Sequence, residues 1–165
     1  MIIAICGLPG SGKTYFSKQL ARALNLARFS TDELRAELKQ LGIYDEGSRL
    51  AVYQKIAKRI LPSLLREESI IIDGSFNNKA QRQEIAAVAQ RVQTPLVFIQ
   101  CHADEATSLA RVNQTRDYTE ADSRVYYLLK ELWEGLEPPF LSLDTANESL
   151  EERLKKTRVY LQTFK

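Results

Sequence analysis

The clearest chemical signal in this sequence is a run of eight residues near its start, Gly7-Leu8-Pro9-Gly10-Ser11-Gly12-Lys13-Thr14. The run fits the phosphate-loop pattern, in which a glycine is followed, after any four residues, by Gly-Lys-Ser or Gly-Lys-Thr. Glycines let such a loop curl so that backbone N–H groups point inward at phosphate oxygens. In this pattern Lys13 reaches the β- and γ-phosphates, and the Thr14 hydroxyl ligates Mg²⁺. The loop therefore predicts binding of a nucleoside triphosphate together with Mg²⁺.

A second pair of residues is placed to orient the group that would receive a phosphoryl group. Asp32 follows the short strand predicted at residues 26–30 and opens a helix, where its carboxylate can act as a general base toward an acceptor hydroxyl. Arg35 lies on nearly the same helix face, and its planar guanidinium suits an acceptor phosphate or carboxylate, or the transferring group. The sequence leaves a second interpretation open, in which Asp32 is only a helix-start acid in a surface ion pair.

Asp73 ends the apolar run 69–73, which reads as a strand buried on both faces. In phosphate-loop proteins an acid at this place orients Mg²⁺ or its water shell, so we predict that Asp73 serves the metal together with Thr14. The alternative is a turn residue that ends the strand before Gly74. The nearby Ser75 and Asn77 are interpreted as helix caps rather than ligands.

Three arginines bracket a polar segment further along the chain. Arg111, Arg116 and Arg124 suit a mobile lid that excludes water and neutralises the charge of a transferring phosphoryl group. We predict that Arg116, more than Arg111 or Arg124, does this work, within a lid near residues 111–124. The alternative is an ordinary solvated helix end.

These residues need strands and helices that bring them together. Apolar runs predict strands at residues 2–6, 26–30, 69–73, 95–101 and 141–144. Helical periodicity predicts helices that begin near residues 15 and 31, a longer one after a loop at residues 44–49, and others at 78–91, 104–115, 125–133 and 150–164. Gly42 should end the helix that begins at residue 31, and Pro62 should bend or divide the long helix. Alternating strands and helices predict an α/β fold in which helices cover both faces of a parallel sheet.

Composition indicates the number of domains, the state of the cysteines and which kinds of partner are favoured. The chain has 165 residues, 44% of them hydrophobic and 27% charged, which suits one domain spanning residues 1–165. A net charge of +2 does not by itself indicate nucleic acid binding. The two cysteines, Cys6 and Cys101, lack metal-site spacing and lie in predicted strands, so we expect reduced core thiols in a cytoplasmic protein. We expect neither a signal peptide nor a membrane-spanning segment.

Taken together, these motifs resemble a known group. The sequence is similar to the small adenylate-kinase-like branch of P-loop kinases, predicted kinases with an AAA-type ATP-binding domain. Gluconate kinase, chloramphenicol phosphotransferase and the kinase domain of phage polynucleotide kinase are similar. The resemblance rests on the loop at residues 7–14, on Ser30-Thr31-Asp32-Glu33-Leu34-Arg35 and on Ile71-Ile72-Asp73-Gly74-Ser75-Phe76. A weaker match covers Arg111 through Ala121 and then Leu136-Glu137-Pro138.

The resemblance implies a fold and roles for particular residues. It implies a five-stranded sheet of order 2-3-1-4-5 and a small lid. In polynucleotide kinases the acid that matches Asp32 is the general base, and the arginine that matches Arg35 helps to hold the acceptor. The family's lid carries two arginines, and the pair here, Arg111 and Arg116, is expected to contact the nucleotide.

Two functions remain open at this stage. The first is an ATP-dependent kinase in which Lys13, Asp32, Arg35 and Arg116 are catalytic, and whose acceptor is a small alcohol or, less favoured, a nucleic acid 5′-hydroxyl end. The second is an NTPase or nucleotide-dependent switch without an acceptor. The sequence leaves the acceptor, the choice between ATP and GTP, and the oligomeric state undetermined.

Overall fold

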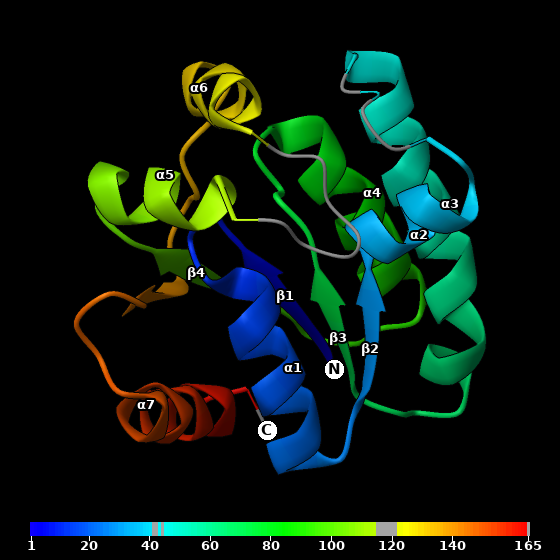
Figure 1. Cartoon of the computed structure of the whole chain (residues 1–165). Coiled ribbons are helices and arrows are strands. Elements are labelled where there is room, and N and C mark those ends of the chain that lie inside the picture. Colours follow the sequence, from blue (N-terminus) through cyan, green and yellow to red (C-terminus); the bar gives the residue numbers. More distant parts are fainter. Residues whose placement is uncertain (41–42, 44, 115–121, 165) are drawn as a thin grey trace.

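A five-stranded parallel sheet, in the order β2-β3-β1-β4-β5, forms the centre of the computed structural model (Figure 1). The structure describes residues 1–40, 43, 45–114 and 122–164. The strands are β1 (Ile2–Cys6), β2 (Ala27–Ser30), β3 (Ile70–Asp73), β4 (Leu96–His102) and β5 (Phe140–Asp144). This order and the parallel pairing confirm the fold expected from the resemblance. No helix in the described part of the chain is both long enough and apolar enough to cross a bilayer.

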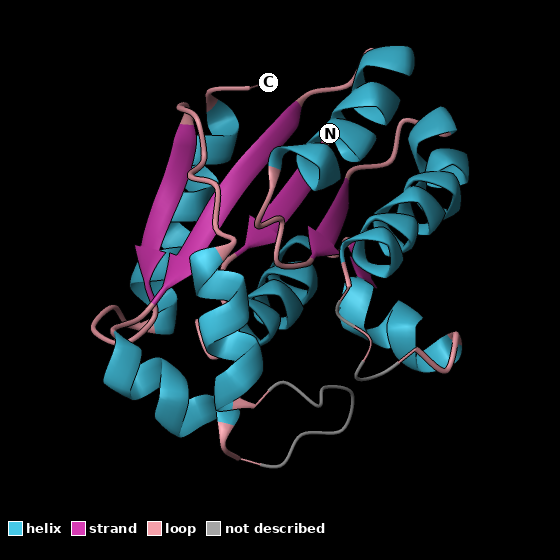
Figure 2. Cartoon of the chain, turned by 90° about the horizontal axis from the view of Figure 1, so that it is seen from above, coloured by secondary structure: helices cyan, strands magenta, loops and turns pink. Residues whose placement is uncertain are grey.

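Helices cover both faces of the sheet, which makes it the middle of three layers (Figure 2). The helices are α1 (Lys13–Leu24), α2 (Thr31–Glu37), α3 (Glu46–Leu65), α4 (Lys79–Arg91), α5 (Glu105–Val112), α6 (Ser123–Glu131) and α7 (Leu150–Gln162). α3 and α4 pack on one face and α1 and α7 on the other, while α5 and α6 lie beyond the carboxyl ends of the strands.

The central strands are mostly apolar because both of their faces are covered. In β3, Ile70 and Ile72 pack toward α3 and α4, whereas Ile71 packs toward α1. All three side chains are fully buried. Side chains alternate between the two faces of a strand, so a sheet between two helical layers needs hydrophobic residues at every position.

Most helix boundaries lie within two or three residues of the sequence-based expectation, and two larger differences have a clear physical reason. α2 ends at Glu37, well before the expected Gly42, which lies outside the described residues. Lys39 adopts a left-handed conformation with φ 55°, and the next residue, Gln40, donates its N–H to the Arg35 carbonyl at 2.9 Å. This is the usual helix-ending geometry built without glycine, so the glycine rule placed the end too late. The loop expected at residues 44–49 is also too long, because Asp45 caps α3 and the helix begins at Glu46.

Pro62 does not divide the long helix. α3 continues from Glu46 to Leu65 with Pro62 inside it. A proline within a helix costs about 3 kcal/mol. The same stretch buries Ile56, Ile60 and Leu64 against the sheet, and each such side chain contributes about 1.5–3 kcal/mol. Packing therefore outweighs the lost backbone hydrogen bond.

The buried face of β3 gives a direct test of this packing. Replacing Ile71 by alanine should lower the free energy of unfolding by about 2–5 kcal/mol, because a cavity opens between the sheet and α1. Val159 on α7 is 59% exposed, so Val159→Ala should change stability by less than about 0.5 kcal/mol. Urea denaturation followed by circular dichroism measures both. Equal losses would contradict the described packing.

Candidate active site

The glycine loop joins β1 to α1 and is pressed tightly against neighbouring backbone. Gly10 and Gly12 have φ values of 76° and 79°, in the left-handed region that glycine tolerates. A Cβ atom on Gly10 would lie 2.2 Å from the Ser108 carbonyl oxygen. Gly12 is the N-cap of α1 and has no side chain to satisfy the first backbone N–H groups of the helix. Those groups remain available for an anion at the positive end of the helix.

Thr145, directly after β5, fixes the outer side of this loop. Its hydroxyl donates to the Ser11 carbonyl at 2.8 Å and accepts from the Arg111 guanidinium at 2.8 Å. Arg111, on α5, also donates to the carbonyls of Gly10 and Thr145, at 3.3 and 3.1 Å. The structure therefore places Arg111, one of the predicted nucleotide contacts, at the edge of the loop. Sequence reasoning missed Thr145, although its place just after a strand is the signal that selected other candidates.

Asp73 lies beneath the loop and is almost completely buried, with 2% exposed. One carboxylate oxygen, Oδ1, is 3.5 Å from the Thr14 hydroxyl. The other, Oδ2, accepts hydrogen bonds from Ser17 at 3.0 Å and from Arg28 at 2.9 Å. Burial raises the pKa of Asp73, and the positive charges of Lys13 and Arg28 oppose that rise. Arg28 thus helps to keep a deeply buried carboxylate ionised.

The oxygens at this point fit Mg²⁺. Thr14 and Asp73 offer hard oxygen donors side by side. Within the described ranges, no group of three or more His, Cys, Asp or Glu side chains could hold a metal by itself. Mg²⁺ commonly uses one or two protein oxygens and takes its other ligands from phosphate and water. The buried Ser11 hydroxyl in the loop finds no hydrogen-bond partner among the residues that the structure describes, so the loop still has polar groups to satisfy.

Asp32 lies at the same edge of the sheet as the loop. It stands in the first turn of α2, two residues after Ser30, which is the register partner of Asp73 on the neighbouring strand. β2, β3 and β1 are adjacent, so Asp32, Asp73 and the loop follow three neighbouring strand ends. The negative charge of Asp32 contributes to the raised pKa of Asp73, as expected for nearby groups.

Arg35 and Asp32 face each other one turn apart. Their closest nitrogen and oxygen atoms are 3.5 Å apart, and the exposed fractions of the side chains are 8% for Arg35 and 32% for Asp32. The arginine is therefore held in place while the carboxylate remains accessible. This arrangement suits a base that must meet an incoming hydroxyl beside a fixed cation.

The remaining residues singled out from the sequence differ in where the structure places them. Arg116 lies outside the described residues, and the rest of the predicted lid around it is covered only in part. Arg124 is 92% exposed and pairs with Asp122 at the start of α6. The cap expected at Ser75 or Asn77 is in fact Asn78, whose side chain accepts from the Gln81 N–H. Asn77 instead contacts α3 and α6, because its buried amide meets side-chain and backbone partners there.

A glycine loop that leads from a central strand into a helix, within a parallel sheet of this strand order, defines a P-loop kinase fold. The chain belongs to the family described as an AAA domain, which matches residues 2–137. The resemblance inferred from the motifs is thereby confirmed.

Sequence relatives include kinases and proteins of other names. A shikimate kinase from Chlamydia pneumoniae is 29% identical over 110 residues, which are 59% of this chain and 62% of the kinase. A KTI12 homolog from Rattus norvegicus is 28% identical over 105 residues, 61% of this chain and 30% of that protein. An uncharacterized protein of Mycobacterium tuberculosis is 25% identical over 109 residues, 59% of this chain and 22% of that protein. The matched segment thus spans less than two thirds of these relatives.

Solved structures share the fold along nearly the whole chain. A sugar kinase from Janibacter sp. HTCC2649 superimposes with a TM-score of 0.77 at 16% identity, covering 98% of this chain and 94% of that one. The Mycobacterium tuberculosis APS kinase, in complex with AMPPNP and APS, gives 0.74 at 16% identity over 98% and 96%. Kti12 from Chaetomium thermophilum, in complex with ADP-AlF3, gives 0.74 at 19% identity over 97% of each chain.

The tight packing of the loop predicts a large cost for a single methyl group. Gly10→Ala should lower the free energy of unfolding by about 1–3 kcal/mol, because it meets both a left-handed φ and the Ser108 carbonyl. It should also weaken binding of a nonhydrolysable ATP analogue. The control is Gly135→Ala, since in the described part of the chain a Cβ there would meet no atom within 4 Å beyond its own chain neighbours. Thermal unfolding and calorimetric titration of both variants provide the test, and equal behaviour would contradict the described loop.

The Arg28–Asp73 pair predicts a pH-dependent loss of stability. Arg28→Gln should raise the pKa of Asp73 further above its unfolded value. Ionising the buried Asp73 carboxylate destabilises the folded state. This destabilisation is absent at pH values below the pKa of Asp73 in the unfolded chain and complete above its pKa in the folded protein. The variant should therefore lose more stability at neutral pH, about 3 kcal/mol, than in mild acid. Denaturation at both pH values, repeated in an Asp73→Asn background, checks this, since that background should remove the pH dependence.

Proposed function

We propose that this chain is an ATP-dependent kinase that transfers the γ-phosphoryl group to a hydroxyl group of a small acceptor. The observation that carries the proposal is the shared edge of three adjacent strands. The glycine loop, Asp73 and Asp32 follow β1, β3 and β2 in that spatial order. Ligands of open parallel sheets bind beyond the carboxyl ends of the strands, where these groups lie.

Each residue has a defined task in this proposal. The loop backbone and Lys13 bind and orient the β- and γ-phosphates, and Thr14 and Asp73 hold Mg²⁺, directly or through water. The metal supplies charge neutralisation on the phosphates. The oxygen of the acceptor hydroxyl bonds to the γ-phosphorus, and Asp32 accepts the proton that this hydroxyl loses. The bond from that phosphorus to the β-bridging oxygen breaks, and ADP leaves.

Three arginines complete the proposed site. Arg35, fixed beside Asp32, holds the acceptor, and Arg111 supports the nucleotide from the loop's outer edge. Arg116 is proposed to neutralise charge on the transferring group, as the sequence pattern suggests. Support for ATP comes from related folds, since the APS kinase and Kti12 structures were determined with AMPPNP and ADP-AlF3.

The second candidate is a nucleotide-dependent switch, or an NTPase without an acceptor. The sequence match to a KTI12 homolog favours it, because that protein is not named as a kinase. The two functions differ in whether ADP release from ATP depends on an added alcohol. Release that ignores every member of an acceptor panel, including a 5′-hydroxyl oligonucleotide, would favour the switch or NTPase.

Asp32→Asn should reduce phosphoryl transfer by about a hundredfold or more, the scale of a lost general base, while ATP affinity is kept. Lys13→Ala should impair transfer and also weaken nucleotide binding. Coupled detection of ADP with the acceptor found in the panel, together with calorimetric titration of an ATP analogue, measures both.

Glu37→Gln is the matched control. Glu37 lies on the same helix as Asp32, where it pairs with Arg59 on the surface. This variant should transfer at the parental rate. If Asp32→Asn also keeps that rate, Asp32 is not the base.

A further inference from the structure

Arg28, the second residue of β2, is a charged residue within the sheet. Its register partner on β3 is Ile71, which packs toward α1, so the Arg28 side chain lies on the same face of the sheet. Only 10% of that side chain is exposed. Burying a charge costs free energy unless close partners replace the lost water. Neither the sequence motifs nor the proposed catalytic roles account for an arginine at this position.

The Arg28 guanidinium meets two carboxylates that come from different elements. One nitrogen donates to Oδ2 of Asp73, at the end of β3, at 2.9 Å. Another donates to Glu33, in the first turn of α2. A guanidinium is planar and its N–H groups have fixed directions, so it holds two carboxylates in a defined relation to each other. Arg28 thus connects the end of β3 to the helix that carries Asp32.

The two oxygens of Asp73 have different partners. Oδ2 accepts hydrogen bonds from Arg28 and from Ser17, whereas Oδ1 lies 3.5 Å from the Thr14 hydroxyl. The contacts at Oδ2 therefore turn Oδ1 toward Thr14, where Mg²⁺ is proposed to bind. Groups that hydrogen-bond a metal-ligating carboxylate fix its orientation, and the loss of one commonly costs about 10–100-fold in metal affinity or activity.

α2 depends on other elements for its position. It has seven residues, fewer than the about 12–15 that an isolated helix needs to persist in water, and it follows β2 without a loop (Figure 1). One ion pair joins its start, through Glu33, to Arg28, and another joins its end, through Glu37, to Arg59 on α3. The pair of Glu37 and Arg59 is about half exposed, and exposed pairs of this kind contribute little. The buried contact at the start of α2 should therefore matter more.

We infer that Arg28 is a positioning residue that joins the two halves of the proposed site. One side of its guanidinium directs Asp73 toward Thr14 and Mg²⁺, and the other side fixes the first turn of α2, which carries Asp32. The inference rests on the proposed kinase function for the role of Asp32, and Arg28 acts through these two carboxylates rather than on the substrates. A general base must lie within hydrogen-bond distance of the acceptor hydroxyl, and a displacement of about 1 Å can cost about a hundredfold in rate.

Three substitutions separate the two contacts. Arg28→Gln removes both ion pairs, so it should weaken the Mg²⁺ enhancement of ADP binding, which is the ratio of ADP affinities with and without Mg²⁺, by about tenfold or more. Glu33→Gln leaves Asp73 untouched, and in Arg28→Lys the ammonium group can bond Asp73 but cannot span to Glu33. Both of these variants should keep the Mg²⁺ enhancement within about threefold, lower kcat by about tenfold and leave the KM for ATP within about threefold.

The measurements need not depend on turnover. Calorimetric titration of ADP with and without Mg²⁺ gives the Mg²⁺ enhancement, and ADP release with an acceptor from the panel gives kcat and KM. Amide hydrogen exchange of residues 31–37 in the complex with Mg²⁺ and ADP should be faster in Glu33→Gln than in the parental protein. Glu37→Gln is the matched control, because it removes an exposed ion pair from the other end of α2 and should change none of these quantities.

The inference is overturned if Glu33→Gln behaves like Glu37→Gln in kcat and in amide exchange, because Arg28 would then only balance the charge of Asp73. An undiminished Mg²⁺ enhancement in Arg28→Gln also overturns it. If Arg28→Gln does not fold, Glu33→Gln and Arg28→Lys decide.

A failure of the proposed function gives a different result. If no acceptor stimulates ADP release by the parental protein, the kinase proposal fails, while the Mg²⁺ enhancement and the amide exchange still decide whether Arg28 joins the two elements. If Asp32→Asn abolishes transfer and Glu33→Gln leaves it intact, the kinase proposal stands and the role inferred for Arg28 is wrong.

Discussion

The close approach of the glycine loop to the backbone behind it is the constraint on which the site depends. Gly10 lies against the Ser108 carbonyl, and Gly7 and Gly12 have equally little room beside Cys101 and Thr145. Because three separate segments hold the loop, Lys13 and Thr14 begin α1 at a defined place above Asp73. A loop held in this way is preorganised, and a preorganised loop loses less conformational entropy when a ligand binds than a flexible one does.

Much of this architecture could be predicted from the sequence, because the central strands are mostly apolar and each is followed by a helical pattern. The glycine loop could also be predicted, since its pattern of residue types is specific for phosphate binding. The strand order was inferred from family resemblance alone. Strand pairing is decided by contacts between distant segments, and local periodicity says nothing about neighbours. Thr145 was missed for the same reason: it meets Ser11 across 134 positions of sequence.

Local rules failed where tertiary contacts outweighed them. Pro62 was expected to bend or divide the long helix, but α3 is not divided and is held by the side chains that it buries. The helix was expected to end at Gly42, but it ends earlier because Lys39 adopts the left-handed backbone conformation that glycine usually adopts at a helix end. Arg49 had no motif around it, and its importance comes only from burial, which composition and spacing do not reveal. Sequence patterns therefore located the glycine loop, whereas the burial of Arg49 became visible only in the structure.

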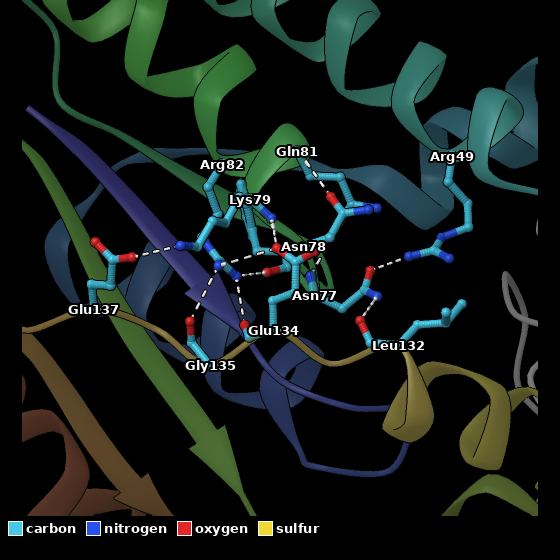
Figure 3. A network of polar contacts seen from close by, with 11 residues as sticks. Arg49, Asn77, Asn78, Lys79, Gln81, Arg82, Leu132, Glu134, Gly135 and Glu137 are labelled. Carbon is cyan, nitrogen blue, oxygen red and sulfur yellow. Dashed lines mark hydrogen bonds and ion pairs between the residues drawn. The ribbon is translucent and has the colours of Figure 1, made fainter.

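The buried side chain of Asn77 links α3 to the end of α6 through both of its polar atoms. Its amide oxygen accepts from Arg49 on α3, and its amide nitrogen donates to the Leu132 carbonyl at the end of α6, at 3.2 Å (Figure 3). A carboxylate would lose the donor, and a hydrocarbon would lose both bonds. α3 and α6 are consequently tied through one small rigid plane. The position of the Arg49 guanidinium and the end of α6 are therefore set by the same amide group.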